Sequence, residues 1–225
     1  MGKEALYLVH AELEASYVDE WNAWHAREHV PLVAKKGGFI GAARMRHVRP
    51  DGELQDPPRF TTVYRASGLG AVRTYLEGGE VGRMRAHHDA WLTDRKARLW
   101  REVFEENYSV GSDGKALART PDLSEGRAAF VVRVRVDAEL APEWSIWYDG
   151  DHMPKVVVAG GFLRAGRWRL VDETSGAVRF AVIYEASSLD VVKAFRAGPG
   201  PVFGSEHEAK FGGRVAIDRE VWTAA

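Results

Sequence analysis

The chain of 225 residues has no cysteine, no surplus of charge of either sign and no long apolar run. The absence of cysteine excludes disulfides, thiolate nucleophiles and cysteine-ligated metals, and agrees with a reducing compartment. Its 31 Lys and Arg residues nearly balance its 32 Asp and Glu residues, so the charge pattern of a nucleic-acid-binding protein is missing. The start MGKEALYLVH lacks a signal-peptide pattern, and no run approaches the ~20 apolar residues of a membrane span. We therefore expect a cytoplasmic protein without a nucleic-acid or membrane partner.

The chain contains two copies of one sequence pattern. Residues 21–46, WNAWHAREHVPLVAKKGGFIGAARMR, match residues 144–169, WSIWYDGDHMPKVVVAGGFLRAGRWR, without a gap and at a constant distance of 123 positions. A second match, 120 positions apart, joins FTTVYRASGLGAVRTYLEGG from Phe60 to FAVIYEASSLDVVKAFRAGP from Phe180. Repeats of this kind define the organisation of a chain, and this one is an internal duplication.

Each copy predicts the order strand, helix, strand, strand, helix, strand, with one helix inserted before the last strand. In the first copy we predict strands at 5–13, 39–48, 59–66 and 99–110, a first helix starting at Ser16, and helices at 69–76 and 81–94. In the second copy we predict strands at 127–136, 162–171, 178–186 and 214–222, and helices at 142–158, 188–196 and 202–211. The copies are thus residues 1–110 and 127–225, joined by a turn-rich linker at 111–126.

A proline, Pro31, lies within the predicted first helix of the first copy. Because proline has no amide hydrogen and crowds the preceding turn, Pro31 predicts a break or kink near His29. Gly37-Gly38 then ends the helix.

The fold class follows from the order of the elements. A βαββαβ unit forms a four-stranded antiparallel sheet with both helices on one face. The middle strands place apolar side chains on both faces, as in Val63 beside Tyr64 and Val182 beside Ile183. Monomers seldom expose a large apolar face. We therefore predict an α+β protein in which two ferredoxin-like repeats pack sheet to sheet as a pseudo-twofold α/β barrel, with further homo-oligomerisation left open.

The Trp-x-x-Trp, His-x-Pro and Gly-Phe motifs, followed by an arginine, resemble the dimeric α/β-barrel superfamily, and within it the EthD-like and methylmuconolactone-isomerase-like branch. In these families the two ferredoxin-like units normally come from two chains, whereas here one chain supplies both. The resemblance implies a cavity between the sheet and the helices of each copy. It does not fix the reaction, because the superfamily includes cofactor-free oxygenases, isomerases, lyases, cyclases and haem-binding proteins.

The candidate catalytic residues are the histidines of the two His-x-Pro motifs, His29 and His152. An imidazole can take and give a proton near pH 7; the alternative is that each histidine caps the end of its helix. His25 and Tyr148 lie four residues earlier and share a helix face with these histidines. We expect them to act as partners, with Tyr148 donating to a developing oxyanion, although both also suit aromatic packing.

Further residues recur in both copies and are candidates for substrate binding. They comprise an indole, a strand arginine and a histidine of the inserted helix from each copy: Trp24, Trp147, Arg44, Arg167, His87 and His207. A guanidinium group can hold a carboxylate, and the alternative is an arginine that faces solvent. We expect the paired tryptophans to line two separate cavities, one in each copy.

One motif favours metal chemistry instead. Residues 25–29, HAREH, match H-x-x-E-H, in which two histidines hold zinc and the glutamate activates water. Pro31 interrupts the long helix that such a site needs, and the second copy has Tyr148 and Asp151 in place of His25 and Glu28. We therefore predict no metal.

The sequence has no Gly-rich phosphate loop, dinucleotide fingerprint or nucleophile elbow. We therefore predict no cofactor, with haem as an alternative that would use His87, His88 or His207 as its axial ligand. The resulting prediction is a cofactor-free enzyme of isomerase, lyase, cyclase or oxygenase type, which uses histidine acid–base chemistry on a small apolar or aromatic metabolite. The alternative is a protein of the same fold that binds a small ligand or haem without turnover.

Overall fold

The computed structural model describes residues 3–49, 51–117, 127–171 and 176–225. The chain divides into two compact units. Unit 1 comprises Met1–His47, Leu54–Glu105 and Ala224–Ala225, and unit 2 comprises Val48–Glu53 and Glu106–Thr223. The division falls inside the last strand of the first copy, so the end of that strand belongs to unit 2, whereas the sequence assigned it to the first copy.

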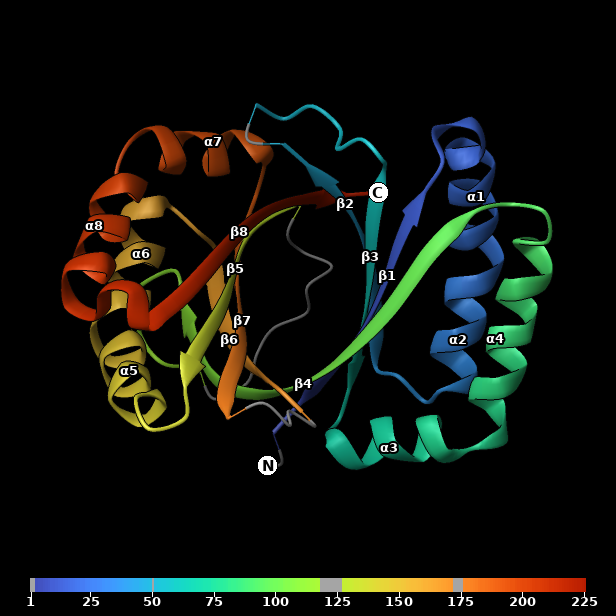
Figure 1. Cartoon of the computed structure of the whole chain (residues 1–225), viewed down its shortest axis with the longest axis horizontal. Helices are drawn as coiled ribbons and strands as arrows, with labels where there is room; N and C mark the ends of the chain where they lie inside the picture. Colours follow the sequence, from blue (N-terminus) through green and yellow to red (C-terminus); the bar gives the residue numbers. More distant parts are fainter. Residues whose placement is uncertain (1–2, 50, 118–126, 172–175) are drawn as a thin grey trace. The chain divides into compact units, whose positions relative to one another are not determined.

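Unit 1 has an antiparallel sheet with the strand order β4-β1-β3-β2. Its strands are β1 (Ala5–Leu13), β2 (Gly41–Val48), β3 (Arg59–Ala66) and β4 (Ala97–Gly111). Its helices are α1 (Val18–Trp24), α2 (Val30–Lys36), α3 (Leu69–Glu77) and α4 (Gly79–Trp91). They cover one face of the sheet (Figure 1). The register places Val9 of β1 opposite Thr62 and Arg101.

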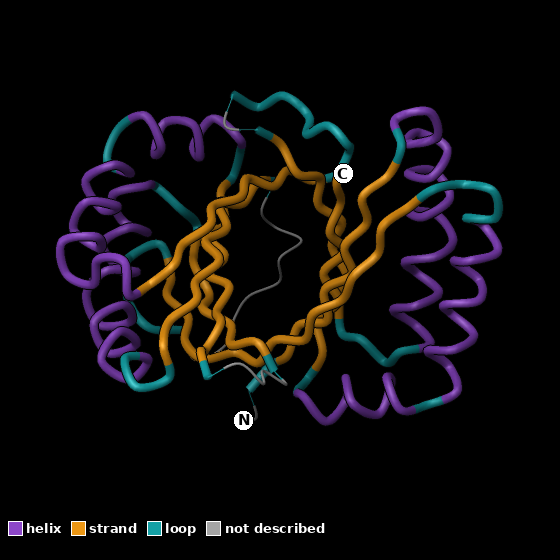
Figure 2. The backbone as a smooth tube through the Cα atoms, viewed as in Figure 1, coloured by secondary structure: helices purple, strands orange, loops and turns teal. Residues whose placement is uncertain are grey.

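Unit 2 repeats this arrangement with the strand order β8-β5-β7-β6. Its strands are β5 (Ala128–Asp137), β6 (Arg164–Leu170), β7 (Ala177–Ala186) and β8 (Val215–Ala224). Its helices are α5 (Ala141–Trp147), α6 (Met153–Gly160), α7 (Leu189–Ala197) and α8 (Gly200–Phe211). These helices too lie on one face of their sheet (Figure 2). The register places Val132 of β5 opposite Val182 and Arg219.

A π-helical turn joins the two halves of the first helix in each unit, at His25–His29 and at Tyr148–His152. In these turns the N–H of Val30 donates to the carbonyl of His25, and the N–H of Met153 donates to that of Tyr148. The wider turn lets the chain pass a proline that has no N–H to donate and would crowd a regular turn. The irregularity predicted near Pro31 is therefore a π-turn within a helix that continues to Lys36, not a break.

Other boundaries differ from the sequence prediction by a few residues. The helix predicted to reach residue 94 ends at Trp91, and Asp94 has a left-handed φ of 65°. The first part of the predicted linker turns back on β4, because Val110 forms a bridge with Ala116. Residues 118–126 lie outside the described residues.

Each unit has an aromatic core between its sheet and its helices. In unit 1, Tyr7, Phe39, Tyr64 and Tyr75 pack together, and in unit 2 the matching rings are Phe130, Phe162, Tyr184 and Phe195. The neighbours predicted to be apolar on both faces, Val63 with Tyr64 and Val182 with Ile183, are all buried. The packing of one sheet against the other stays a prediction. None of the helices in the described ranges is long and apolar enough to cross a membrane.

Candidate functional site

The two units contain cavities of very different size at matching places. The cavity of unit 2 measures about 210 Å³, whereas the cavity of unit 1 measures about 30 Å³. His25 and His29 line the smaller cavity, and Tyr148 and His152 line the larger one. Each π-turn therefore directs its two predicted catalytic side chains to the interior of its own unit.

One helix position contributes to the difference in size. Met84 of α4 lines the cavity of unit 1, and the same alignment that pairs His87 with His207 places Gly204 of α8 at the equivalent position. Gly204 lines the cavity of unit 2 without filling it. A Cβ atom added there would first meet Nη2 of Arg219, at an ordinary contact distance of 3.6 Å. A side chain therefore fills in unit 1 the space that glycine leaves open in unit 2.

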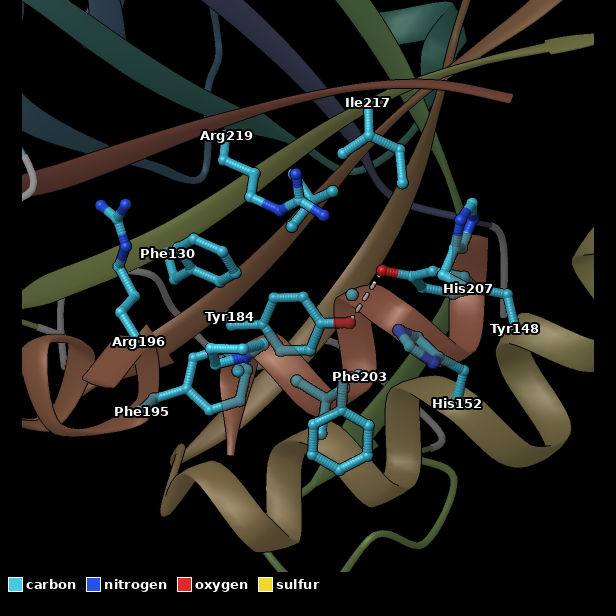
Figure 3. A pocket seen from close by; sticks show the side chains of 15 residues that line it. Phe130, Tyr148, His152, Tyr184, Phe195, Arg196, Phe203, His207, Ile217 and Arg219 are labelled. Carbon is cyan, nitrogen blue, oxygen red and sulfur yellow. Dashed lines mark hydrogen bonds between the residues drawn. The ribbon is translucent and has the colours of Figure 1, made fainter. Parts of the chain in front are cut away.

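The wall of the unit 2 cavity has distinct aromatic, polar and cationic parts. Phe130, Phe195 and Phe203 supply aromatic surface. Tyr148, His152 and His207 lie together on one side, and Arg196 lies across the cavity from them (Figure 3). Arg219 of β8 also lines the space. Mostly apolar walls with a few convergent polar groups are typical of small-molecule sites.

The polar side of this cavity contains hydrogen-bonding groups with defined roles. The hydroxyl groups of Tyr148 and Tyr184 are 2.8 Å apart and share a hydrogen bond. Among the described residues, Nδ1 of His152 is buried without a hydrogen-bond partner. A buried polar atom without a partner is costly, so this nitrogen is suited to meet a ligand. Nε1–H of Trp144 donates to Nε2 of His207 over 3.0 Å, which places the proton of the neutral imidazole on Nδ1.

Burial controls the charge of these groups. It lowers the pKa of His152 to about 4, and the charge of His207 contributes in the same direction. Burial also lowers the pKa of His207 to about 4, with a further contribution from Arg219. The pKa values of Tyr148 and Tyr184 are raised by burial. At neutral pH the site therefore holds neutral imidazoles, which can accept a proton, beside phenols that keep theirs.

Arg44 and Arg167 hold the π-turns and do not line either cavity. Arg167 donates to both carboxylate oxygens of Asp149 over 2.7 and 2.6 Å. Arg44 donates from Nε to Nδ1 of His25 over 3.1 Å, and from Nη2 to Oδ1 of Asn22 over 2.5 Å. The solvent-facing alternative is therefore wrong. The structure commits both guanidinium groups to residues of the adjacent helix, so the expected carboxylate contact with a substrate has no support.

The tryptophans also lie elsewhere than expected, because neither pair lines a cavity. Trp147 packs on His152, with ring centres 4.6 Å apart, and on Phe211 at 5.1 Å. Trp24 packs on His29 at 5.1 Å and stacks on Trp91, also at 5.1 Å. The indoles contact the inserted helices α8 and α4 and pack against the histidine rings of their own unit.

Unit 1 gathers four histidines, His25, His29, His87 and His88, around Trp24. Nδ1 of His29 and Nδ1 of His87 are 3.1 Å apart, so one donates to the other. Burial lowers the pKa of His25 well below 6.5, that of His29 to about 3 and that of His88 to about 4. His88, rather than His87, reaches the small cavity.

Neither cofactor alternative fits these contacts well. Within the part of the chain that the structure describes, no three His, Asp or Glu side chains are placed to hold a metal ion, and Glu28 of the HAREH motif is exposed. For haem, Nε2 of His207 already accepts a hydrogen bond from Trp144, and the cavity beside His88 measures about 30 Å³. A cofactor-free protein stays a prediction.

Among the lining residues of the unit 2 cavity that were not candidates from the sequence are Tyr184, Arg196, Gly204 and Arg219. Tyr184 has its counterpart in Tyr64, within the second match between the copies. Arg219 has its counterpart in Arg101, but this pair becomes visible only when the strand register aligns β4 with β8. Tyr184 could have been found from the sequence match alone, whereas Arg219 could be found only once the pairing of the strands was known.

Comparisons with known proteins agree with this fold. Residues 127–224 match the model of a family described as a domain of unknown function (DUF4286), so this match is confined to the second copy. No curated protein matches the chain.

Three solved structures illustrate the shared fold. A candidate monooxygenase from Fusobacterium nucleatum subsp. nucleatum is 10% identical, with 99% of this chain and 93% of that chain covered and a TM-score of 0.60. An anthrone oxidase-like protein is 10% identical, with 98% of this chain and 91% of that chain covered and a TM-score of 0.59. A mutant chlorite dismutase from Candidatus Nitrospira defluvii is 14% identical, covers 99% and 91%, and has a TM-score of 0.56. At such low identity these similarities establish an α+β fold in common and no activity.

Proposed function

We propose that the chain is an enzyme that transfers a proton next to a carbonyl group of a small aromatic or apolar substrate, in the cavity of unit 2. The observation that carries this proposal is the unpartnered, buried Nδ1 of His152 beside the hydrogen-bonded pair Tyr148 and Tyr184. A proton acceptor and an oxyanion donor thus share one wall of an aromatic cavity. These are the two groups that enolisation requires.

The chemistry follows from the protonation states. Because burial lowers the pKa of His152 to about 4, its imidazole is neutral at pH 7 and has a lone pair for a C–H proton. As the proton moves to His152, negative charge develops on the carbonyl oxygen, where a tyrosine hydroxyl donates a hydrogen bond. The new imidazolium and the enolate attract each other beside the buried side chains of His152, Tyr148 and Tyr184, where the interaction is stronger than in water. Return of the proton to a different carbon completes an isomerisation.

His207 supplies a second donor at the same wall. Its Nε2 is occupied by the indole N–H of Trp144, and so its Nδ1–H is left to face a ligand. The hydrogen bond from Trp144 therefore fixes the tautomer of His207. We assign His207 to substrate positioning and His152 to proton transfer.

Unit 1 has a supporting role in this proposal. Its counterpart of His152, His29, is hydrogen-bonded to His87, and its cavity of about 30 Å³ is too small for a substrate. A duplicated chain needs only one active cavity. We propose that unit 2 is the active copy.

The comparisons support the same reaction class. Anthrone is an aromatic carbon acid whose C–H bonds are activated by a carbonyl group, so the name of one structural neighbour fits the proposed first step. A second neighbour carries the name of a candidate monooxygenase. Membership of the EthD-like branch, and the pairing of two ferredoxin-like repeats in one barrel, remain part of this proposal.

The test is hydrogen–deuterium exchange at carbon. The purified protein is incubated in D₂O with 2-indanone, 2-tetralone and anthrone, and loss of the acidic C–H signals is followed by proton NMR. We expect faster exchange than in buffer for at least one probe. Removal of a general base typically costs ~10²–10⁴-fold, so His152→Ala should lower the protein-dependent rate by that factor.

His29→Ala is the matched control, because it removes the equivalent imidazole from unit 1. It should leave the exchange rate unchanged while the far-ultraviolet circular dichroism of both variants stays that of the parent. Exchange no faster than in buffer for all three probes, or equal exchange in the parent and in folded His152→Ala, would refute the proposed reaction. A bound but unexchanged probe would then indicate a ligand-binding protein.

A further inference from the structure

An arginine occurs at the same place in both sheets. Val9 and Val132 are matching positions of the repeat, and they lie opposite Arg101 and Arg219 respectively. Both arginines line the cavity of their own unit. The duplication has therefore kept an arginine in the wall of two cavities that differ in size.

In unit 1 the protein's own phenols face this charge. Burial raises the pKa of Tyr7, and the charges and hydrogen bonds of Arg101 and Arg85 oppose that rise. Burial likewise raises the pKa of Tyr75 to about 12, and the charge of Arg101 opposes this rise too. Arg101, Tyr7 and Tyr75 also line the same small cavity, so Arg101 shares it with two phenol groups of its own unit.

In unit 2 both hydroxyl groups are missing. The residues that match Tyr7 and Tyr75 are Phe130 and Phe195, and both line the larger cavity. Within the described ranges, the side chain of Arg219 forms no ion pair or hydrogen bond, although its backbone N–H donates to Asp218. The exchange of two tyrosines for two phenylalanines leaves this guanidinium group free to bind a ligand.

The charged residues that line the cavity also favour an anionic ligand. Among the described residues, its wall contains two arginines, Arg196 and Arg219, and neither aspartate nor glutamate. Arg196 replaces Leu76, its counterpart in unit 1, whereas the second arginine of the unit 1 cavity is Arg85, which lies at a different position. Figure 3 shows Arg196 on the side away from His152 and His207, with Arg219 above the aromatic wall. A ligand that meets the histidines with one end can therefore meet a cation with another.

We propose that Arg219 is the anion-binding residue of the unit 2 cavity, and that its ligand is a one- or two-ring aromatic compound bearing a carboxylate. A guanidinium fork binds a planar carboxylate with two parallel hydrogen bonds, which favours this anion. The cavity of about 210 Å³ is smaller than the ~300–1,000 Å³ of pockets for drug-sized molecules, which limits the ligand to one or two rings. The proposal rests on the proposed function only for the choice of cavity.

A bound carboxylate also serves the proposed reaction. Arg219 contributes to the low pKa values of His152 and His207. An anion paired with Arg219 neutralises that contribution and makes His152 a stronger base once the substrate has bound.

Isothermal titration calorimetry with 2-naphthoate and its neutral isostere 2-naphthamide tests the proposal. The parent protein should bind 2-naphthoate more tightly, and this preference should weaken as salt increases. Arg219→Gln should weaken 2-naphthoate binding roughly 10- to 100-fold, since a hydrogen bond to a charged group contributes that much. Binding of 2-naphthamide should not change.

Two tyrosine–phenylalanine exchanges form a matched pair. Phe130→Tyr places in unit 2 the phenol that faces Arg101 in unit 1, and should abolish the preference for 2-naphthoate. Tyr7→Phe makes the reverse exchange in unit 1, where the cavity has no room, and should leave binding unchanged. Thermal unfolding of each variant checks that it is folded.

The outcomes separate this proposal from the proposed function. If 2-naphthamide binds as tightly as 2-naphthoate, or if Arg219→Gln weakens both equally, the anion site is refuted while the cavity stands. If neither probe binds, both the anion site and the choice of cavity are refuted. A preference for 2-naphthoate that disappears in Arg219→Gln and in Phe130→Tyr supports the proposal.

Discussion

Filling the unit 2 cavity should strengthen the fold while removing its binding site. Gly204→Met introduces the side chain that Met84 provides at the equivalent position of unit 1. Gly204 lies within the helix α8, and the first atom that a new Cβ would meet is the mobile end of Arg219, at 3.6 Å. The substitution therefore has room for a side chain.

Three terms determine the expected change in the unfolding free energy of Gly204→Met. Replacing glycine inside a helix contributes about 0.5–1 kcal/mol to stability, and burying a methionine side chain contributes about 1.5–3 kcal/mol. Ordering that flexible side chain costs up to about 2 kcal/mol. We expect a net gain of about 1–2 kcal/mol, which corresponds to a rise in Tm of about 2–8 °C for a chain of this size.

The assay combines thermal unfolding with calorimetric titration of 2-naphthamide, which does not depend on the anion site. Gly204→Met should unfold at a higher temperature and lose 2-naphthamide binding. The reciprocal variant, Met84→Gly, removes a buried side chain and adds a helix glycine, so it should cost about 3–6 kcal/mol. Retained binding in Gly204→Met with a raised Tm would show that ligands bind elsewhere and refute the assignment of this cavity.

Two further predictions concern stability. The pKa values of His29, His88 and His152 are lowered to about 3, 4 and 4, so the unfolded chain takes up protons below about pH 6.5 that the folded chain does not. The unfolding free energy should be highest above pH 6.5 and fall toward pH 4, by up to about 1.4 kcal/mol per histidine and pH unit; equal urea midpoints near pH 7.5 and pH 5 would contradict this. Asp149→Asn leaves the buried guanidinium of Arg167 without its charge partner and should cost about 3–5 kcal/mol in urea unfolding, and a loss no larger than in an exposed-pair control would contradict a structural role for the pair.

The repeat made much of each unit predictable from sequence. A strand that is apolar on both faces, such as that around Val63, has no periodicity of its own, but its second copy around Val182 supports the assignment. The π-turns could not be predicted from the sequence. Proline shows that a regular turn cannot continue, and whether the chain ends or widens there depends on contacts from distant residues, such as the bond from Arg167 to Asp149.

The site was predictable in part for a similar reason. His152 and Tyr148 belong to the gapless match between the copies, and the structure places both in one cavity wall. Arg167 belongs to the same match, yet the repetition reflects its structural bond to the π-turn. Internal repetition identifies residues with a shared role in both units, and it does not distinguish a ligand contact from a structural contact.

The differences between the copies are therefore more informative about function than their similarities. In unit 1, His29 bonds to His87 and Arg101 lines the cavity together with Tyr7, whereas Nδ1 of His88 is buried without a hydrogen-bond partner among the described residues. In unit 2, within the described residues, Nδ1 of His152 is buried without a partner, and the exposed side chain of Arg219 forms no hydrogen bond or ion pair. Leaving a buried polar group unsatisfied costs about 1–3 kcal/mol, and leaving a cavity open costs dispersion energy as well. Unit 1 also leaves Nδ1 of His88 unsatisfied, so the difference that supports our proposal of unit 2 as the binding copy is its open cavity of about 210 Å³.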